Sequence, residues 1–105
     1  MSCYVIAHIE VTDRTQYMQY AEAAGAQIEA AGGRVLAAGP AAMLEGEPFP
    51  NHNVVLEFPA SEAVDAWYHS DGYQAAIPVR LRSAATSQLA IVPGGIRVAA
   101  GAAAE

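Results

Sequence analysis

"CYVIAHIEVTD", residues 3–13, contains the change of hydrophobic period that decides the fold. Up to Val11 alternate residues are apolar, which is the period of a strand with one buried face. Asp13 then suits the N-cap of a helix, because Gln16 follows three residues later in a capping-box relation. The stretch therefore predicts a strand over 3–11 that leads directly into a helix.

The remainder of the chain continues this alternation of strand and helix patterns. Apolar residues recur at spacings of three and four from Tyr17 to Ala31, and Gly32-Gly33 then ends the first helix. Ser61 suits the N-cap of a second helix, and Pro78 predicts a bend or a restart in a third helical stretch. The remaining predicted elements are strands over 34–39, 53–58 and 87–92, a helix over about 61–70, and a short helical stretch from 73.

This order, β-α-β-β-α-β, is that of the ferredoxin-like plait, an α+β fold with helices on one face of an antiparallel sheet. We expect one domain over residues 1–96, followed by an Ala-rich tail over 97–105 that is disordered because no pattern holds it.

The helix-free face of such a sheet is half apolar here. The residues expected on it are Tyr4, Ile6, His8, Glu10, Asn53, Val55 and Glu57. A second copy of the chain is the simplest cover for a face of this kind, so we expect a homodimer through the sheet.

Charge and composition exclude several kinds of partner. Five arginines, no lysine and eleven acidic residues give a net charge of −6, the wrong sign for nucleic acid or an anionic membrane surface. No apolar segment approaches the roughly 20 residues of a membrane span, and the first residues lack signal-peptide features. We therefore expect a cytoplasmic protein with no nucleic-acid or membrane partner. The one cysteine, Cys3, is interpreted as an apolar strand residue.

Several segments resemble a known family in their order and spacing. They are "YVIAHIEVTD", "YMQYAEAA", "GGRVLAAG", "LEG", "VVLEFP", "AWYHSDGYQ", "PVRLRSAA" and "AIVPG". The chain resembles the DUF1330 family of the dimeric α+β barrel superfamily over residues 2–96. The resemblance implies two plaits packed sheet to sheet with a cavity near each sheet, and no established activity. Asp71-Gly72 departs from the proline-containing pair usual in the family.

His8 and Glu57 are the candidate catalytic pair. Both are expected on the bare face of adjoining strands, where a carboxylate beside an imidazole would suit proton abstraction. The alternative is that the two groups satisfy each other, or pair across a dimer, without any reaction.

Arg80 is the first candidate for ligand binding, because the family pattern keeps an arginine there and a guanidinium binds a carboxylate in a bidentate manner. It could equally pair with Glu57, Glu45 or Asp71, since a buried arginine usually has an acidic partner.

Tyr68, Tyr73 and Asn53 are the other candidates for orienting a ligand. Trp67 is instead interpreted as a core anchor, and Ser70 as a helix cap. His69-Ser70-Asp71 cannot act as a catalytic triad, because consecutive side chains point in different directions. The three histidines show no metal-ligand spacing, so neither a metal nor another cofactor is expected.

Two functional hypotheses remain. The first is a protein that binds a small organic or aromatic acid, a carboxylate or phenol, with acid–base chemistry that needs no cofactor. The alternative is a non-catalytic dimeric structural or interaction module with no turnover.

Overall fold

Strand β1 (Cys3–Val11) is the centre of the fold, because it pairs antiparallel with both β3 (His52–Phe58) and β4 (Ala84–Pro93). Strand β2 (Arg34–Gly39) pairs with β3, which gives an antiparallel sheet of order β2-β3-β1-β4. The computed structural model describes residues 2–96, so the tail predicted over 97–105 lies outside the described residues.

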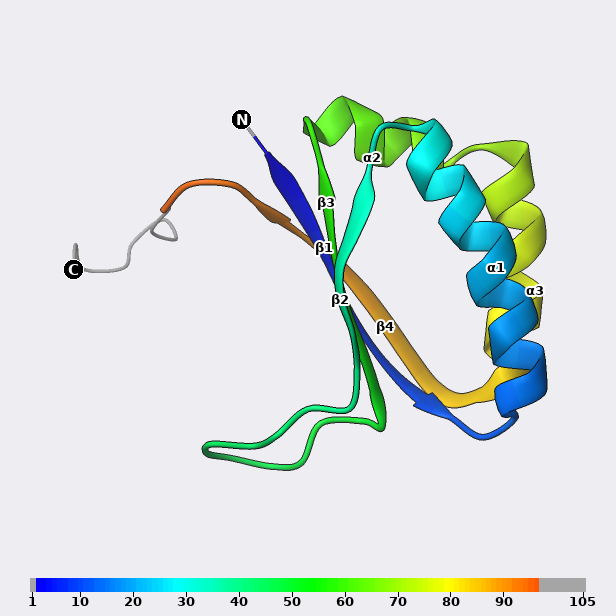
Figure 1. Cartoon of the computed structure of the whole chain (residues 1–105), viewed down its shortest axis with the longest axis vertical. Coiled ribbons are helices and arrows are strands. Elements are labelled where there is room, and N and C mark those ends of the chain that lie inside the picture. Colours follow the sequence, from blue (N-terminus) through cyan, green and yellow to red (C-terminus); the bar gives the residue numbers. More distant parts are fainter. Residues whose placement is uncertain (1, 97–105) are drawn as a thin grey trace.

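Three helices cover one face of this sheet and leave the other face bare (Figure 1). They are α1 (Arg14–Ala30), α2 (Ser61–Tyr68) and α3 (Asp71–Ser83). The observed order and topology confirm the α+β ferredoxin-like fold expected from the sequence. Within residues 2–96 no helix is both long enough and apolar enough to cross a membrane.

The start of α1 follows directly from its sequence. The Asp13 carboxylate accepts a hydrogen bond from the backbone N–H of Gln16 at 3.1 Å and another from the Gln16 side chain at 2.9 Å. Beyond the helix, Gly32 has a φ of +86°, which favours glycine. A Cβ on Gly33 would lie 2.6 Å from the Phe58 ring, so this glycine lets the chain pass close to the core.

The later elements differ in detail from the prediction. Ser61 is the first residue of α2, and the N-cap is Ala60, which makes no side-chain cap bond. Helix α3 is continuous through Pro78, and it has buried residues both before that proline, at Ala76, and after it, at Arg80. Ser70 caps it as predicted, its hydroxyl accepting from the Tyr73 N–H at 3.2 Å.

The core lies between the helices and the sheet. Alternate residues of β1 are buried there, in agreement with the predicted period, and Trp67 of α2 is only 2% exposed. Its ring centroid lies 5.3 Å from that of Phe58 and 4.3 Å from that of Tyr73. The aromatic anchor predicted for α2 is therefore present and packs against β3 and α3.

Candidate functional site

The expected pair of His8 and Glu57 does not form, because the strand register separates the two residues. His8 lies opposite Asn53, whereas Glu57 lies opposite Tyr4, four positions further along β1. At about 3.3 Å per residue this offset is about 13 Å along the sheet, far beyond hydrogen-bond reach. Both side chains are on the bare face, as expected, but at opposite ends of it.

Glu57 is engaged by other residues at its own end of the sheet. Its carboxylate accepts from Arg34 Nε at 2.8 Å, lies 2.8 Å from Arg34 Nη2, and accepts from the Tyr4 hydroxyl at 3.4 Å. These contacts, led by the hydrogen bond from Arg34, hold the pKa of Glu57 below its usual value. A carboxylate stabilised in this way is a weak base, which argues against proton abstraction by Glu57.

His8 and Asn53 contact each other, and together they hold the connection between β2 and β3. His8 Nδ1 lies 2.7 Å from Asn53 Oδ1, and the His8 ring packs edge-on against Phe49 with centroids 4.6 Å apart. The Asn53 amide also donates to the carbonyls of Gly39 and Pro50, at 3.2 and 3.0 Å. Asn53 therefore joins the two ends of the connection between β2 and β3.

Arg80 is buried, with 6% of its surface exposed, and the expected acidic partner is missing. Within residues 2–96 the one ion pair is that between Arg34 and Glu57. Arg80 Nη1 instead donates to the Tyr73 hydroxyl at 2.6 Å, and the guanidinium lies 5.6 Å from the centroid of the Tyr20 ring. Phenol groups on α1 and α3 thus take the place that a carboxylate was predicted to fill.

The guanidinium is also incompletely paired. Arg80 Nε is buried and has no hydrogen-bond partner among the described residues. A buried cation is strongly disfavoured unless charged or hydrogen-bonding groups compensate for the lost water. Arg80 therefore has capacity for one more acceptor, and an anion would satisfy it best.

Of the tyrosines on α1 and α3, Tyr73 and Tyr17 remain protonated at neutral pH. Burial raises the pKa of Tyr73, and its hydroxyl is shared with that of Tyr20 at 2.6 Å. Burial likewise raises the pKa of Tyr17 to about 12. Tyr73 is completely buried, so it contacts Arg80 rather than any cavity. Its hydroxyl accepts the hydrogen bond from Arg80, and the predicted contact of Tyr73 with a ligand stays a prediction.

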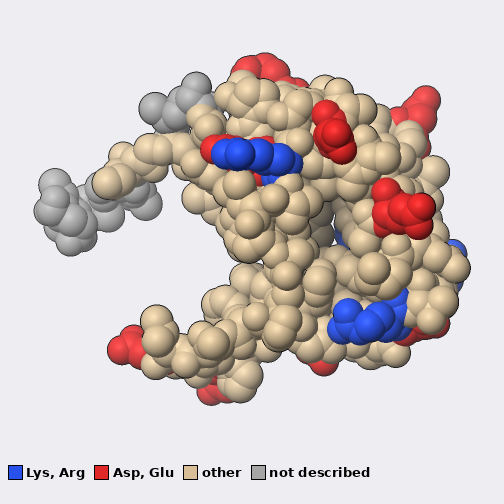
Figure 2. Space-filling model, in the orientation of Figure 1, with Lys and Arg blue, Asp and Glu red and all other residues tan. Residues whose placement is uncertain are grey.

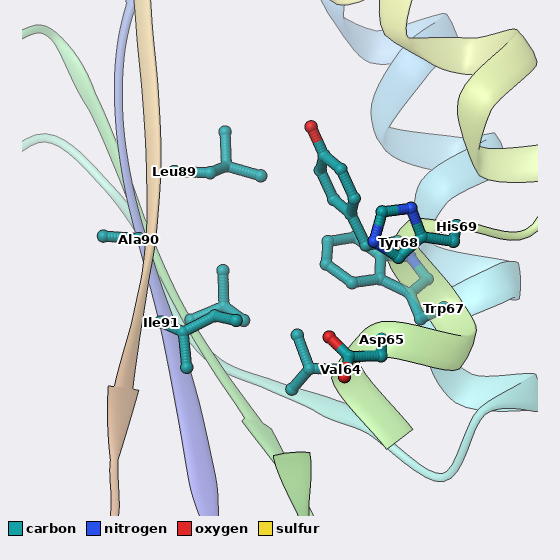
Figure 3. Close-up of a pocket in the computed structure, with 9 residues that line it drawn as sticks. Val64, Asp65, Trp67, Tyr68, His69, Leu89, Ala90 and Ile91 are labelled. Atoms are coloured by element: carbon teal, nitrogen blue, oxygen red, sulfur yellow. The ribbon is translucent and has the colours of Figure 1, made fainter. Parts of the chain in front are cut away.

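A cavity of about 380 Å³ opens between α2 and β4, on the helical side of the sheet (Figure 3). The Tyr68 ring lies on the helical side of this space and extends its hydroxyl between Leu89 and the helices. The structure shows no hydrogen bond from that hydroxyl to any described residue. The full lining is Val5, Val64, Asp65, Trp67, Tyr68, His69, Leu89, Ala90 and Ile91.

A second, apolar cavity of about 110 Å³ lies on the other side of Trp67, between α1 and the sheet. Val5, Trp67 and Leu89 line both spaces, so the two cavities are neighbours within one layer. Tyr20, which shares its hydroxyl with Tyr73, lines the second space. Arg80 itself lines neither cavity; Tyr20, which its guanidinium faces, lines the second one.

Sequence reasoning missed Tyr20 as a site residue. Its position at a helical spacing from Tyr17 and Ala24 indicated only a buried stripe, and the stripe is indeed buried. The signal that could have found it is the presence of two phenols on an otherwise alanine-rich face, because buried tyrosine hydroxyls need a partner. Among residues 2–96 no cluster of three potential metal ligands is present.

Comparison with known proteins agrees with this architecture. The profile of the family described as "Domain of unknown function (DUF1330)" matches residues 2–95. The chain belongs to the DUF1330 family. No curated protein matches this DUF1330 chain.

Solved structures share the fold of the DUF1330 chain at low sequence identity. A protein of unknown function from Rhodopseudomonas palustris is 20% identical, with a TM-score of 0.76 over 91% of this chain and 84% of that one. A dimeric ferredoxin-like protein of unknown function from Thermobifida fusca is 18% identical, with a TM-score of 0.63 over 89% and 91%. A Caulobacter crescentus protein, provisionally named an antibiotic biosynthesis monooxygenase, is 13% identical, with a TM-score of 0.59 over 90% and 91%.

Proposed function

We propose that this DUF1330 protein binds a small organic or aromatic acid in the cavity between α2 and β4, with Arg80 supplying the positive charge. The observation that carries the proposal is the buried guanidinium that lacks a carboxylate partner and has an unpaired Nε. Arg80 does not line the cavity in this structure, so a carboxylate or phenolate ligand would complete that pairing once the tyrosines that contact the guanidinium move aside.

Tyr68 is proposed as the residue that contacts the ligand directly. Its hydroxyl is free to donate a hydrogen bond and is held at the cavity by the helix. Val64, Leu89 and Ile91 provide an apolar surface for the body of the ligand. An apolar cavity with few polar groups is the usual composition of a small-molecule site. Binding without turnover, as in a non-catalytic module, is compatible with the same geometry.

Thermal unfolding with benzoate, phenylacetate and phenol tests the proposal. An acid at a hundred times its dissociation constant should stabilise the protein by about 2.7 kcal/mol. Arg80→Met should weaken binding by at least about tenfold, since it removes the charge but keeps an apolar side chain of similar length. Tyr68→Phe should weaken it less.

Arg82→Met is the matched control, because Arg82 lies on the same helix but is exposed. It should bind the acids as wild type does. Equal weakening by both arginine variants would show that only net charge matters and would remove the assignment to Arg80.

We also propose that the bare sheet face is the interface of a homodimer. Charged residues occur only near the two ends of that face, namely Glu10 at one end and Arg34 with Glu57 at the other. Between them Ile6, Val55 and Ala90 form an uncharged surface, which suits burial against a second copy. The T. fusca neighbour is named as dimeric, which supports the proposal.

Val92→Lys tests the interface, because Val92 is 48% exposed and lies opposite Tyr4 on the bare face. A lysine there should raise the dimer dissociation constant by at least about tenfold, since it buries an unpaired charge. Sedimentation velocity over a concentration series measures this. An unchanged dimer would place the interface elsewhere.

A further inference from the structure

The connection between β2 and β3 forms a projecting arm, residues 40–51, on the side of the sheet away from the helices (Figure 1). Its side chains are almost all exposed, and Leu44 is 98% exposed. Met43 and Phe49 are also partly exposed apolar residues on the arm. Isolated apolar side chains need no explanation on a surface, but three on one projection beside a bare sheet face indicate a contact surface.

The base of the arm is fixed by specific hydrogen bonds. Asn51 Oδ1 accepts from the Val11 N–H at 2.8 Å, and its amide donates to the Val11 carbonyl at 2.9 Å. Glu10 Oε1 accepts from the Asn51 N–H at 2.9 Å. With the His8–Phe49 and Asn53 contacts described above, these bonds tie both ends of the arm to the sheet. The arm is therefore held in one direction before any partner binds, which lowers the entropy lost on association.

We propose that the arm packs on a second copy of the chain and covers the far end of the partner's bare face, where Arg34 lies. This inference rests on the homodimer proposed above and adds the orientation of its two subunits. Figure 2 shows an uncharged hollow between the arm and the end of β4, with acidic side chains at the tip and on the lower edge of the arm. The arm carries Glu45 and Glu47 and no basic residue.

The charges on the arm and at Arg34 favour one orientation of the two subunits over the other. Two sheets that pack face to face about a twofold axis can have that axis along the strands or across them. An axis along the strands would bring the two acidic arms together, which is repulsive. An axis across the strands brings each arm to the partner's opposite end, where Arg34 has a side chain that is 72% exposed. The exposed guanidinium of Arg34, which already pairs with Glu57 of its own chain, would then also meet the partner's acidic arm at each end of the interface.

A hydrophobic truncation at the tip tests the contact itself. Leu44→Asp should raise the dimer dissociation constant by at least about tenfold, because it removes an apolar contact and adds a third acid. Leu81→Asp is the control, since Leu81 is 56% exposed on α3, away from the bare face. It should change the dissociation constant by less than about twofold. Both variants should keep the far-UV circular dichroism spectrum of the wild-type chain, which shows that each is folded.

A charge exchange tests the orientation. The double variant Glu45→Arg with Glu47→Arg, and the single variant Arg34→Glu, should each weaken their own homodimer by about tenfold, because like charges then meet. Mixed together, the two variants should form a heterodimer of nearly wild-type affinity, which native mass spectrometry can identify by mass. This rescue also shows that Arg34→Glu has not simply unfolded the chain.

The outcomes separate this inference from the homodimer. A dimer that Val92→Lys dissociates, but that Leu44→Asp and the charge variants leave intact, overturns the arm contact alone. Homodimers unaffected by either charge variant would overturn the orientation. A wild-type chain that sediments as a monomer overturns the homodimer and the arm contact together.

Discussion

Replacing Trp67 by alanine should lower the free energy of unfolding by about 3–5 kcal/mol. The indole is 2% exposed and packs against Phe58 and Tyr73, so its loss leaves a large void between helix and sheet. Domains of this size have total stabilities of only about 5–15 kcal/mol, so the variant should be close to unfolding at body temperature. Urea denaturation followed by far-UV circular dichroism measures the change.

Leu81→Ala is the matched control for this experiment. Because Leu81 is exposed on α3, its replacement by alanine should lower the free energy of unfolding by less than about 0.5 kcal/mol. Both proteins must be compared at one concentration, because dimerisation adds to the apparent stability. A loss below about 1 kcal/mol for Trp67→Ala would contradict its position at the centre of the core.

Replacing Tyr73 by phenylalanine should lower the free energy of unfolding by about 1–3 kcal/mol, although the aromatic ring is kept. Its hydroxyl is shared by Tyr20 and by Arg80, each at 2.6 Å. Removing it leaves a buried guanidinium with neither a carboxylate nor this phenol as acceptor, and burial of an unpaired charge is expensive. Equilibrium denaturation again measures the loss.

A double-mutant cycle identifies the cause. Tyr73→Phe combined with Arg80→Met should cost clearly less than the sum of the single variants, because the charge and its partner leave together. Tyr68→Phe is the control, since its hydroxyl makes no hydrogen bond to a described residue. Strict additivity of the two single effects would show that the guanidinium does not depend on Tyr73.

The fold followed from the sequence because it depends on local patterns. The alternation in β1, the cap at Asp13 and the glycines after α1 act over a few residues, and each is present in the structure. The predicted N-cap of α2 was wrong: Ser is the better cap residue by type, yet the helix begins one residue earlier, with Ala60 as its N-cap. Backbone conformation, rather than residue type, decides between them.

The candidate site could be predicted from the sequence only in part, because it depends on strand register and on long-range packing. Alternation placed His8 and Glu57 on one face correctly but could not say how β1 and β3 are aligned. The acidic partner of Arg80 was expected only because buried arginines generally have one. Here α1 supplies Tyr20 from a stripe whose phenols looked like ordinary core residues, so the actual partners were not identifiable from spacing.

A crystal structure of the protein with benzoate bound tests the central claim most directly. We predict the benzoate carboxylate within hydrogen-bond distance of the Tyr68 hydroxyl or the Arg80 guanidinium, with its ring between α2 and β4 near Leu89 and Ile91. Benzoate bound at His8 on the bare sheet face, with Arg80 still contacting only tyrosines, would contradict the account.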